Sequence, residues 1–171
     1  MSIRVEVVGV RVEMPSNQPI VLLKEESGQR YLPIWIGAVE ATAIAFAQQG
    51  LKPQRPLTHD LLMNVLSASG HELAEVNLTE IKDGIFFAEL TLAGGIHISA
   101  RPSDAIALAL RGERPIFVSE QMLESASIEL NDEEIRALAQ LQAGQPDEAE
   151  VAKFRDFLDR SEEHTSELQS H

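Results

Sequence analysis

The chain has 171 residues, 44% hydrophobic and 24% charged, which is the size and composition of one globular domain with a short appendage. It contains no cysteine, which excludes disulfides, thiolate metal sites and a cysteine nucleophile. No apolar run approaches the roughly 18 residues of a membrane span. Charged and apolar residues alternate at the N-terminus, which is typical of a strand and not of a signal peptide. We therefore expect a cytoplasmic protein that contacts no membrane.

The net charge is −13, and no segment of the chain carries an excess of basic residues. A module that binds DNA constitutively usually carries a positive patch, which releases counterions from the phosphates. Nucleic-acid chemistry by this chain would therefore need bridging cations or a locally positive groove.

The first half of the chain is predicted to form three strands and two helices. In chain order these are strands over residues 3–12, 20–26 and 30–36, and helices over residues 38–49 and 59–68. Alternating apolar residues indicate the first strand, with a bulge at Gly9. Ser27 and Gly28 separate two apolar runs and so indicate a hairpin. Gly50 ends the first helix, and Thr58 is expected to be the N-cap of the second.

The second half repeats the order of three strands and a helix, and then adds a fourth strand and a second helix. The predicted elements are strands over residues 73–82, 85–93, 95–100 and 115–119, and helices over residues 102–110 and 121–126. Asp83-Gly84 and Gly94-Gly95 are both signals of two-residue hairpin turns. Pro102 is suited to the first position of a helix, and Gly112 closes that helix.

The composition changes after Leu130, so we expect a domain over residues 1–130 and an acidic helical extension over residues 131–159. Asn131 is expected to cap a helix over residues 132–142, and a second amphipathic helix is expected over residues 147–159. Residues 160–171, RSEEHTSELQSH, look like the in-frame translation of a sequencing-library adapter. A polar disordered tail is the other interpretation, and in either case we exclude these residues from the fold.

The two halves of the domain align at an offset of 64 residues without a gap. Residues 32–37 and 40–46 correspond to residues 96–101 and 104–110, with four identical positions of which three are alanine. This repeat predicts an α+β fold, a single domain whose mixed β-sheet is built from two similar β-rich halves, each followed by a helix with small residues on one face.

Hydrolysis of a phosphodiester with the help of a metal needs carboxylates for a hard cation, an acid or base, and a positive charge facing the phosphate. The side chains that meet these needs are Glu40, His59, Asp60, His97, Arg101 and Asp104. Arg101 and Asp104 flank a strand-to-helix junction, where helix amides favour anions and an arginine can clamp phosphate.

Simpler roles compete with each of these interpretations. Ser103, Asp104 and Glu40 are residues that any capped helix uses in its first turn, and Arg101 can simply pair with the two carboxylates. Adjacent helical residues do not share a face, so His59 and the aspartate that follows it form a poor chelate. His97 lies between two isoleucines of a strand and faces either solvent or a groove.

Three stretches of the chain resemble the bifunctional nuclease domain family. They are residues 32–37 (LPIWIG) with Glu40 and Ala41, residues 55–60 (RPLTHD) and residues 99–108 (SARPSDAIAL). The resemblance covers roughly residues 3–130 in the family's order. It implies a compact α+β domain of bacteria and plants, to which nuclease activity on both RNA and DNA is ascribed.

From the resemblance we expect a nuclease of loose specificity that depends on a divalent cation, Mg or Mn. A homo-oligomer is also expected, and it fits both this function and the alternative given below. The expected catalytic residues are Asp104, Glu40 and His59. Arg101 and Ser103 are expected to bind the nucleic acid, while Asp104, Glu40 and Asp60 would hold the metal. The alternative is a non-catalytic, oligomeric regulatory domain that binds a protein or a small ligand, which the acidic charge and the acidic helices favour.

Overall fold

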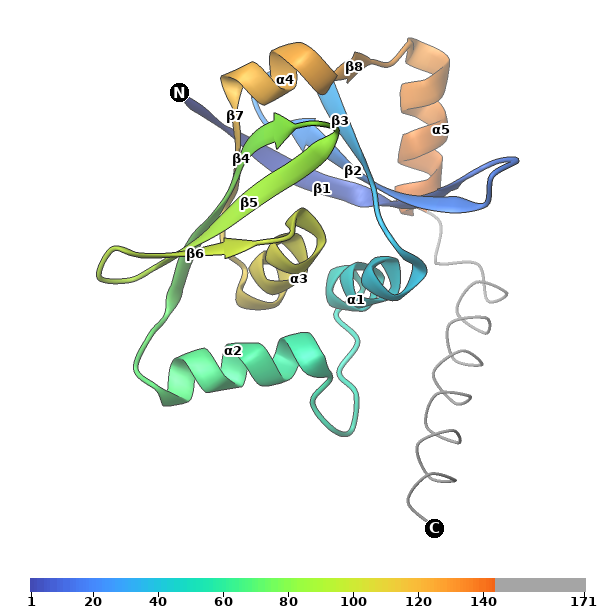
Figure 1. Cartoon of the computed structure of the whole chain (residues 1–171). Helices are drawn as coiled ribbons and strands as arrows, with labels where there is room; N and C mark the ends of the chain where they lie inside the picture. The colour runs from blue at the N-terminus through green and yellow to red at the C-terminus, as the bar shows by residue number, and fades with distance from the viewer. Residues whose placement is uncertain (144–171) are drawn as a thin grey trace. The chain divides into compact units, whose positions relative to one another are not determined.

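A computed structural model describes residues 1–143, and the chain divides into two units after Leu130. The first unit is an α+β fold with a mixed sheet of eight strands, as the sequence predicts (Figure 1). The second unit begins with α5 (Asp132–Ala143). Asn131 caps this helix, since its Oδ1 accepts from the amide of Glu134 while its own amide donates to the Glu134 carboxylate, both at 2.8 Å. The helix predicted over residues 147–159 and the adapter-like residues 160–171 lie outside the described residues.

The elements of the first unit follow the predicted order closely. The strands are β1 (Ser2–Glu13), β2 (Gln18–Glu25), β3 (Arg30–Trp35), β4 (Leu73–Lys82), β5 (Ile85–Leu92), β6 (Ile96–Ala100), β7 (Ile116–Ser119) and β8 (Ile128–Glu129). The helices are α1 (Ala38–Gln48), α2 (Thr58–Ala68), α3 (Pro102–Gly112) and α4 (Glu120–Ala126). Only β8 was not predicted, because two residues are too few to show an alternating pattern.

The sheet has the strand order β6-β5-β4-β7-β1-β2-β3-β8, which places β7 between two similar halves. β7 pairs in parallel with β4 and antiparallel with β1. The unit β1-β2-β3-α1 is therefore repeated by β4-β5-β6-α3 on the other side of β7. Helices α1 and α3 both have 11 residues and begin at Ala38 and Pro102, which matches the predicted offset of 64.

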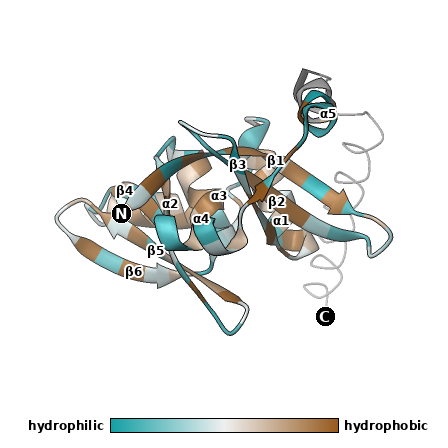
Figure 2. Ribbon diagram, turned by 90° about the horizontal axis from the view of Figure 1, so that it is seen from above, coloured by the Kyte–Doolittle hydropathy of each residue, from teal (hydrophilic) through white to brown (hydrophobic). Residues whose placement is uncertain are grey.

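The core lies between the sheet and the helices that follow each half. Helices α1, α2 and α3 lie on one side of the sheet, below it in Figure 1, and α1 packs against α3. Residues 105–109 of α3 are all buried, and three of them are alanines that allow this close packing. Figure 2 shows the apolar residues that run along β1, β2 and α1, in agreement with the buried Val21, Leu23 and Ile44.

Local features confirm the predicted turns and bulge and correct one predicted cap. Both two-residue turns have positive φ at each position, with 54° and 76° at Asp83-Gly84 and 93° and 82° at Gly94-Gly95. The register of β1 shifts at Gly9, as expected of a bulge. The prediction that Thr58 is an N-cap is wrong: Thr58 is the first helical residue, and no side chain caps α2 at the preceding position. No helix within residues 1–143 is long and apolar enough to cross a membrane.

Candidate functional site

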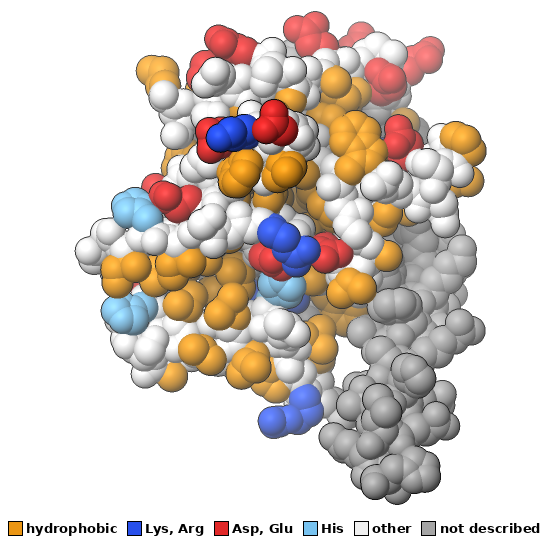
Figure 3. Space-filling view, in the orientation of Figure 1, with side chains coloured by type: hydrophobic (Ala, Val, Ile, Leu, Met, Phe, Trp, Pro, Cys, Tyr) orange, Lys and Arg blue, Asp and Glu red, His pale blue; other side chains and the backbone are white. Residues whose placement is uncertain are grey.

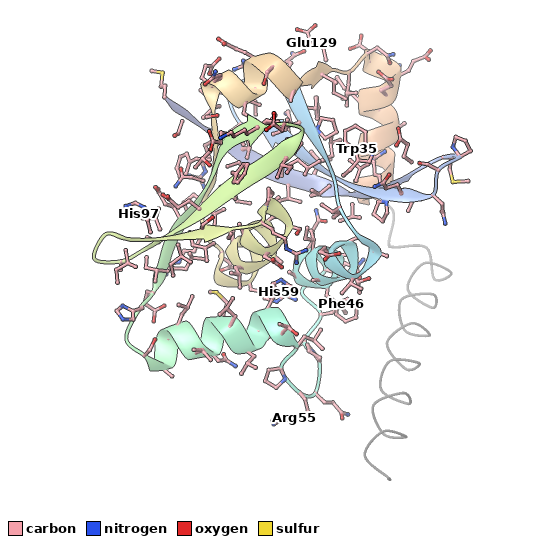
Figure 4. All side chains as sticks on the ribbon, in the orientation of Figure 1. Trp35, Phe46, Arg55, His59, His97 and Glu129 are labelled. Carbon is pink, nitrogen blue, oxygen red and sulfur yellow. The ribbon has the colours of Figure 1, made fainter. Side chains whose placement is uncertain are left out.

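The N-termini of α1, α2 and α3 meet at one place beside the C-terminal end of β6 (Figure 4). The second residue of α2, His59, hydrogen-bonds to the third residue of α3, Asp104. Arg101 ends the connection from β6 to α3 and reaches Glu40, which is the third residue of α1. We call these four side chains the N-terminal cluster. Because helix N-termini carry a partial positive charge, three of them together favour an anion at this point.

Asp104 is the centre of the N-terminal cluster and uses both of its carboxylate oxygens. Its Oδ1 lies 2.8 Å from Nε2 of His59, and its Oδ2 accepts from Nε of Arg101 at 2.8 Å. Burial alone would raise the pKa of Asp104, but the hydrogen bonds and charges of Arg101 and His59 outweigh it and lower that pKa. Asp104 contacts α2 through His59 and the residue before its own helix through Arg101, so the simple capping role weighed for it from the sequence does not describe its contacts.

Arg101 joins the two carboxylates and is the most exposed member of the cluster. Its Nη1 donates to Oε1 of Glu40 at 3.0 Å, while its Nε holds Asp104. These two hydrogen bonds raise the pKa of Arg101, so the guanidinium stays charged. Its side chain is 64% exposed, compared with 16% for His59. The cluster therefore presents a guanidinium to solvent beside a largely buried histidine. Figure 3 shows basic, acidic and histidine side chains gathered at the centre of the view.

Gly37 makes room for the Glu40 carboxylate. A Cβ atom at Gly37 would lie only 2.2 Å from Oε2 of Glu40, which is far inside van der Waals contact. The backbone of Gly37 has φ −77° and ψ 164°, which any residue adopts, so the restriction is steric and not conformational. In the sequence this residue ends a strand and aligns with Arg101 in the repeat.

The Arg111 side chain donates hydrogen bonds to all three helices. Its Nε donates to Oδ1 of Asp60 at 2.8 Å, and its Nη1 donates to the carbonyl oxygens of Ala43 and Ala107 at 3.1 and 3.0 Å. These acceptors belong to α2, α1 and α3 respectively, and the Arg111 side chain is only 9% exposed. Arg111 therefore fixes the first turn of α2, which carries His59, against the other two helices.

Two residues predicted for the site, Asp60 and Ser103, and the further candidate His97 lie outside the N-terminal cluster. Asp60 is engaged by Arg111 and by the amide of Leu57, whose nitrogen lies 3.0 Å from its Oδ2. Ser103 is buried in the first turn of α3. His97 lies on β6, where its Nδ1 is 2.8 Å from Oε1 of Glu89 on β5.

The charge around the cluster differs from that of the rest of the chain. Residues 41–59 and 90–103 contain no acidic residue, and residues 61–71 contain no Asp, Glu, Lys or Arg. Lys52 and Arg55 lie in the loop between α1 and α2, and Figure 4 shows Arg55 at the end of this loop. The loop over residues 49–57 therefore carries two basic residues and no acidic one.

The donor atoms of the cluster suit a hard cation only in part. Within residues 1–143, no group of three or more His, Asp or Glu side chains converges closely enough to hold a metal ion. The Glu40 and Asp104 carboxylates are joined by Arg101 instead. Mg²⁺ commonly uses only one or two protein carboxylates together with water and substrate phosphates, so these two side chains fit such a site once Arg101 releases the Glu40 carboxylate.

These features define an α+β domain of two similar halves, with a histidine, an arginine and two carboxylates where its helices begin. The chain matches the bifunctional nuclease domain over residues 21–131, and it belongs to the bifunctional nuclease domain family.

Named relatives extend from bacteria to plants. An uncharacterized protein of Mycobacterium tuberculosis is 49% identical over 155 residues, which cover 91% of this chain and 92% of that protein. Bifunctional nuclease 2 of Arabidopsis thaliana is 27% identical over 128 residues, covering 70% of this chain and 39% of the plant protein. Bifunctional nuclease 1 of Oryza sativa subsp. japonica is 26% identical over 112 residues, covering 62% of this chain and 34% of that protein.

Proposed function

We propose that this protein is a nuclease that hydrolyses phosphodiester bonds of RNA and DNA, and that the N-terminal cluster is its active site. The observation that carries the proposal is the His59–Asp104–Arg101 arrangement, in which one carboxylate orients both a histidine and an exposed arginine. The family to which the chain belongs, and the names of its plant relatives, support nuclease chemistry.

His59 is the proposed acid or base. Its Nε2 is occupied by Asp104, so Nδ1 is the ring nitrogen that faces the reaction. The Asp104 carboxylate fixes the ring orientation and stabilises the imidazolium that forms when Nδ1 takes a proton from the attacking water. The same nitrogen then returns the proton to the leaving oxygen.

Arg101 is the proposed phosphate ligand. Its exposed guanidinium can exchange the Glu40 carboxylate for a phosphate oxygen while Nε keeps its bond to Asp104. The converging N-termini of α1, α2 and α3 add their partial positive charge where negative charge develops on the phosphorus oxygens.

The proposed reaction also uses a divalent cation, Mg or Mn. With His59 neutral, the charges of the cluster sum to −1, because one arginine faces two carboxylates. A phosphate approaches such a site poorly unless a cation is added. Glu40 and Asp104 would hold this ion, which would neutralise the charge of the phosphate.

A non-catalytic binding domain is the second candidate. It is favoured by the observation that each charged side chain of the cluster already has a partner within the chain. Such a domain would bind a nucleic acid or a small anion at the same place without cleaving it.

The test is a cleavage assay with the full chain, purified by two independent routes to exclude host nucleases. Single-stranded RNA, single-stranded DNA and plasmid are incubated with Mg²⁺, Mn²⁺ or chelator. Asp104→Asn is compared with Asp83→Asn, a matched control at a hairpin turn whose positive φ of 54° suits asparagine.

Cleavage that needs the metal and is lost only in Asp104→Asn is the expected result. Cleavage that survives in Asp104→Asn would place the chemistry elsewhere. A folded wild-type protein that binds these substrates but cleaves none of them would make the binding domain the better description.

A further inference from the structure

Strand β6 is an edge of the sheet whose outer side pairs with no other strand among the described residues. It runs over five residues with the sequence IHISA, which has no Lys, Arg, Asp, Glu or Pro. Natural proteins usually protect an edge strand with a charge, a proline or a bulge, because its free N–H and C=O groups otherwise pair with another chain. The other edge, β8, has only two residues and offers little to pair with. β6 is thus the one long, unprotected edge of the described sheet.

Apolar side chains surround this edge on the side that carries the helices. Ile98 and Ile96 lie opposite the buried Leu90 and Leu92 of β5, yet they are 40% and 42% exposed. Helix α2 continues the apolar surface with Leu61, Leu62 and Val65, all of which are exposed, and α2 has no fully buried residue. Figure 3 shows this apolar surface beside the N-terminal cluster. An apolar surface of this kind, next to an open edge, is typical of an interface.

The distribution of charged residues indicates which kind of partner can bind at the β6 edge. The chain carries a net charge of −13, so two copies repel each other over most of their surfaces. Residues 61–71 contain no Asp, Glu, Lys or Arg, and neither do residues 90–100, which include β6. A second copy can therefore approach this face without bringing like charges together. Antiparallel pairing of a strand with its own copy also forms a closed two-fold contact.

We propose that two copies of this chain associate through antiparallel pairing of β6 with the same strand of the second copy, which also covers the exposed apolar residues of α2. The overlap that uses all five residues of the strand is centred on Ile98. In this register Ala100 pairs with the partner's Ile96. Arg101 then follows beside the partner's Gly95, so that each copy borders the N-terminal cluster of the other. The dimer does not depend on the proposed nuclease activity.

The experiment is sedimentation equilibrium of the full chain over a wide range of concentrations, with Ile98→Lys and Ile85→Lys compared with the wild type. Ile85 is also an exposed strand isoleucine, at 60%, but it lies outside the pairing between β5 and β6. Wild type and Ile85→Lys are expected to have twice the chain mass of 18.8 kDa. Ile98→Lys, which places two like charges at the centre of the contact, should raise the dimer dissociation constant about a hundredfold or more.

Hydrogen exchange of the β6 amides is a second measurement that requires no variant. The amides of residues 96–100 that point away from β5 should become protected as the wild-type concentration passes the dimer dissociation constant, whereas those that pair with β5 are protected already. A wild type that stays monomeric at all concentrations would overturn the proposal. So would a dimer that Ile98→Lys leaves intact, since it would use another face. Protection of the outward-pointing β6 amides in a monomer would mean that another part of the chain covers the strand, which also contradicts a second copy there.

Discussion

Arg101 and Gly37 occupy the same position in the two halves of the domain, one residue before helices α3 and α1 respectively. The half that contains α3 has a long cationic side chain at this position, whereas the half that contains α1 has no side chain there. The space left at Gly37 holds the Glu40 carboxylate, and Arg101 reaches across to it at 3.0 Å. The cluster is therefore an asymmetric feature of a nearly symmetric pair of helices.

Gly37→Ala tests this relationship directly. The new methyl group would lie 2.2 Å from Oε2 of Glu40, so the carboxylate must move and its bond to Arg101 should break. A misplacement of about 1 Å in a catalytic group commonly costs roughly a hundredfold in rate, and we expect a loss of this order in cleavage. Gly9→Ala is the control, because its added Cβ would meet nothing closer than 3.8 Å. Equal activity of the two variants would show that Glu40 has no part in the reaction.

Asp104→Asn should abolish activity with little change in stability. The amide keeps the shape of the side chain but removes the charge that orients His59 and Arg101. We expect cleavage to fall by about 10²–10⁴-fold, as for the loss of a general acid or base. The melting temperature should change by only a few degrees, since partly exposed ion pairs contribute about 0.2–1 kcal/mol. A variant that unfolds instead would show that Asp104 acts mainly in holding the helix.

Arg111→Met should separate α2 from the other helices. It removes the donor for Asp60 and for two carbonyl oxygens at a position where the side chain is only 9% exposed. Loss of one partner from a buried ion pair commonly costs about 3–5 kcal/mol, and we expect a destabilisation near this range in urea unfolding.

The imidazole signals of His59, followed by NMR, distinguish a positioning role of Arg111 from a purely stabilising one. In Arg111→Met these signals should shift toward those of Asp104→Asn, because His59 loses its contact with the Asp104 carboxylate. Arg111→Lys keeps the charge and should restore part of the wild-type spectrum. Unchanged His59 signals in a destabilised Arg111→Met would contradict the positioning role.

Stability should fall in acid because two carboxylates have lowered pKa values in the folded state. Hydrogen bonds from Arg30, at 2.7 and 3.0 Å, lower the pKa of Glu25 below its ordinary 4.5, and the pKa of Asp104 lies below its ordinary 3.8. Their contribution is complete at neutral pH. It is lost as the pH falls through the folded pKa values, because the unfolded chain binds these protons first.

Unfolding by urea between pH 7 and pH 2 measures this loss. Glu25→Gln should be less stable than the wild type at pH 7 and should show a flatter decline in acid, since one of the two groups is gone. An identical slope for both proteins would mean that Glu25 contributes nothing to the acid sensitivity.

Most of the fold could be predicted from the sequence because each element has a clear local pattern. The turns at Asp83-Gly84 and Gly94-Gly95 need residues that tolerate positive φ, and glycine or proline bounds α1 and α3. The offset of 64 residues predicted the two halves. Nothing in the local pattern placed β7 at the centre of the sheet, because strand order depends on pairing over long distances.

The site was predictable only where its residues lie close in sequence. Arg101 and Asp104 are three residues apart at a helix start, which indicated a cluster. The role of Arg111 could not be read in this way, because a basic residue in the last turn of a helix ordinarily indicates only favourable interaction with the helix dipole. Gly37 did carry a signal, since the repeat aligns it with Arg101, but its significance depends on where Glu40 points in three dimensions.

The central position of β7 also determines when the domain can be completed during synthesis. β7 has four residues and joins the halves of the sheet by pairing Ile3 with Val118 and Leu78 with Val118. A nascent chain therefore carries two incomplete sheets, with β1 and β4 both open, until this strand has left the ribosome. Pairing over such a sequence distance is slow, and open strand edges associate with other chains in the meantime. A protein with this arrangement is therefore exposed to association with other chains for longer during synthesis than one whose halves close separately.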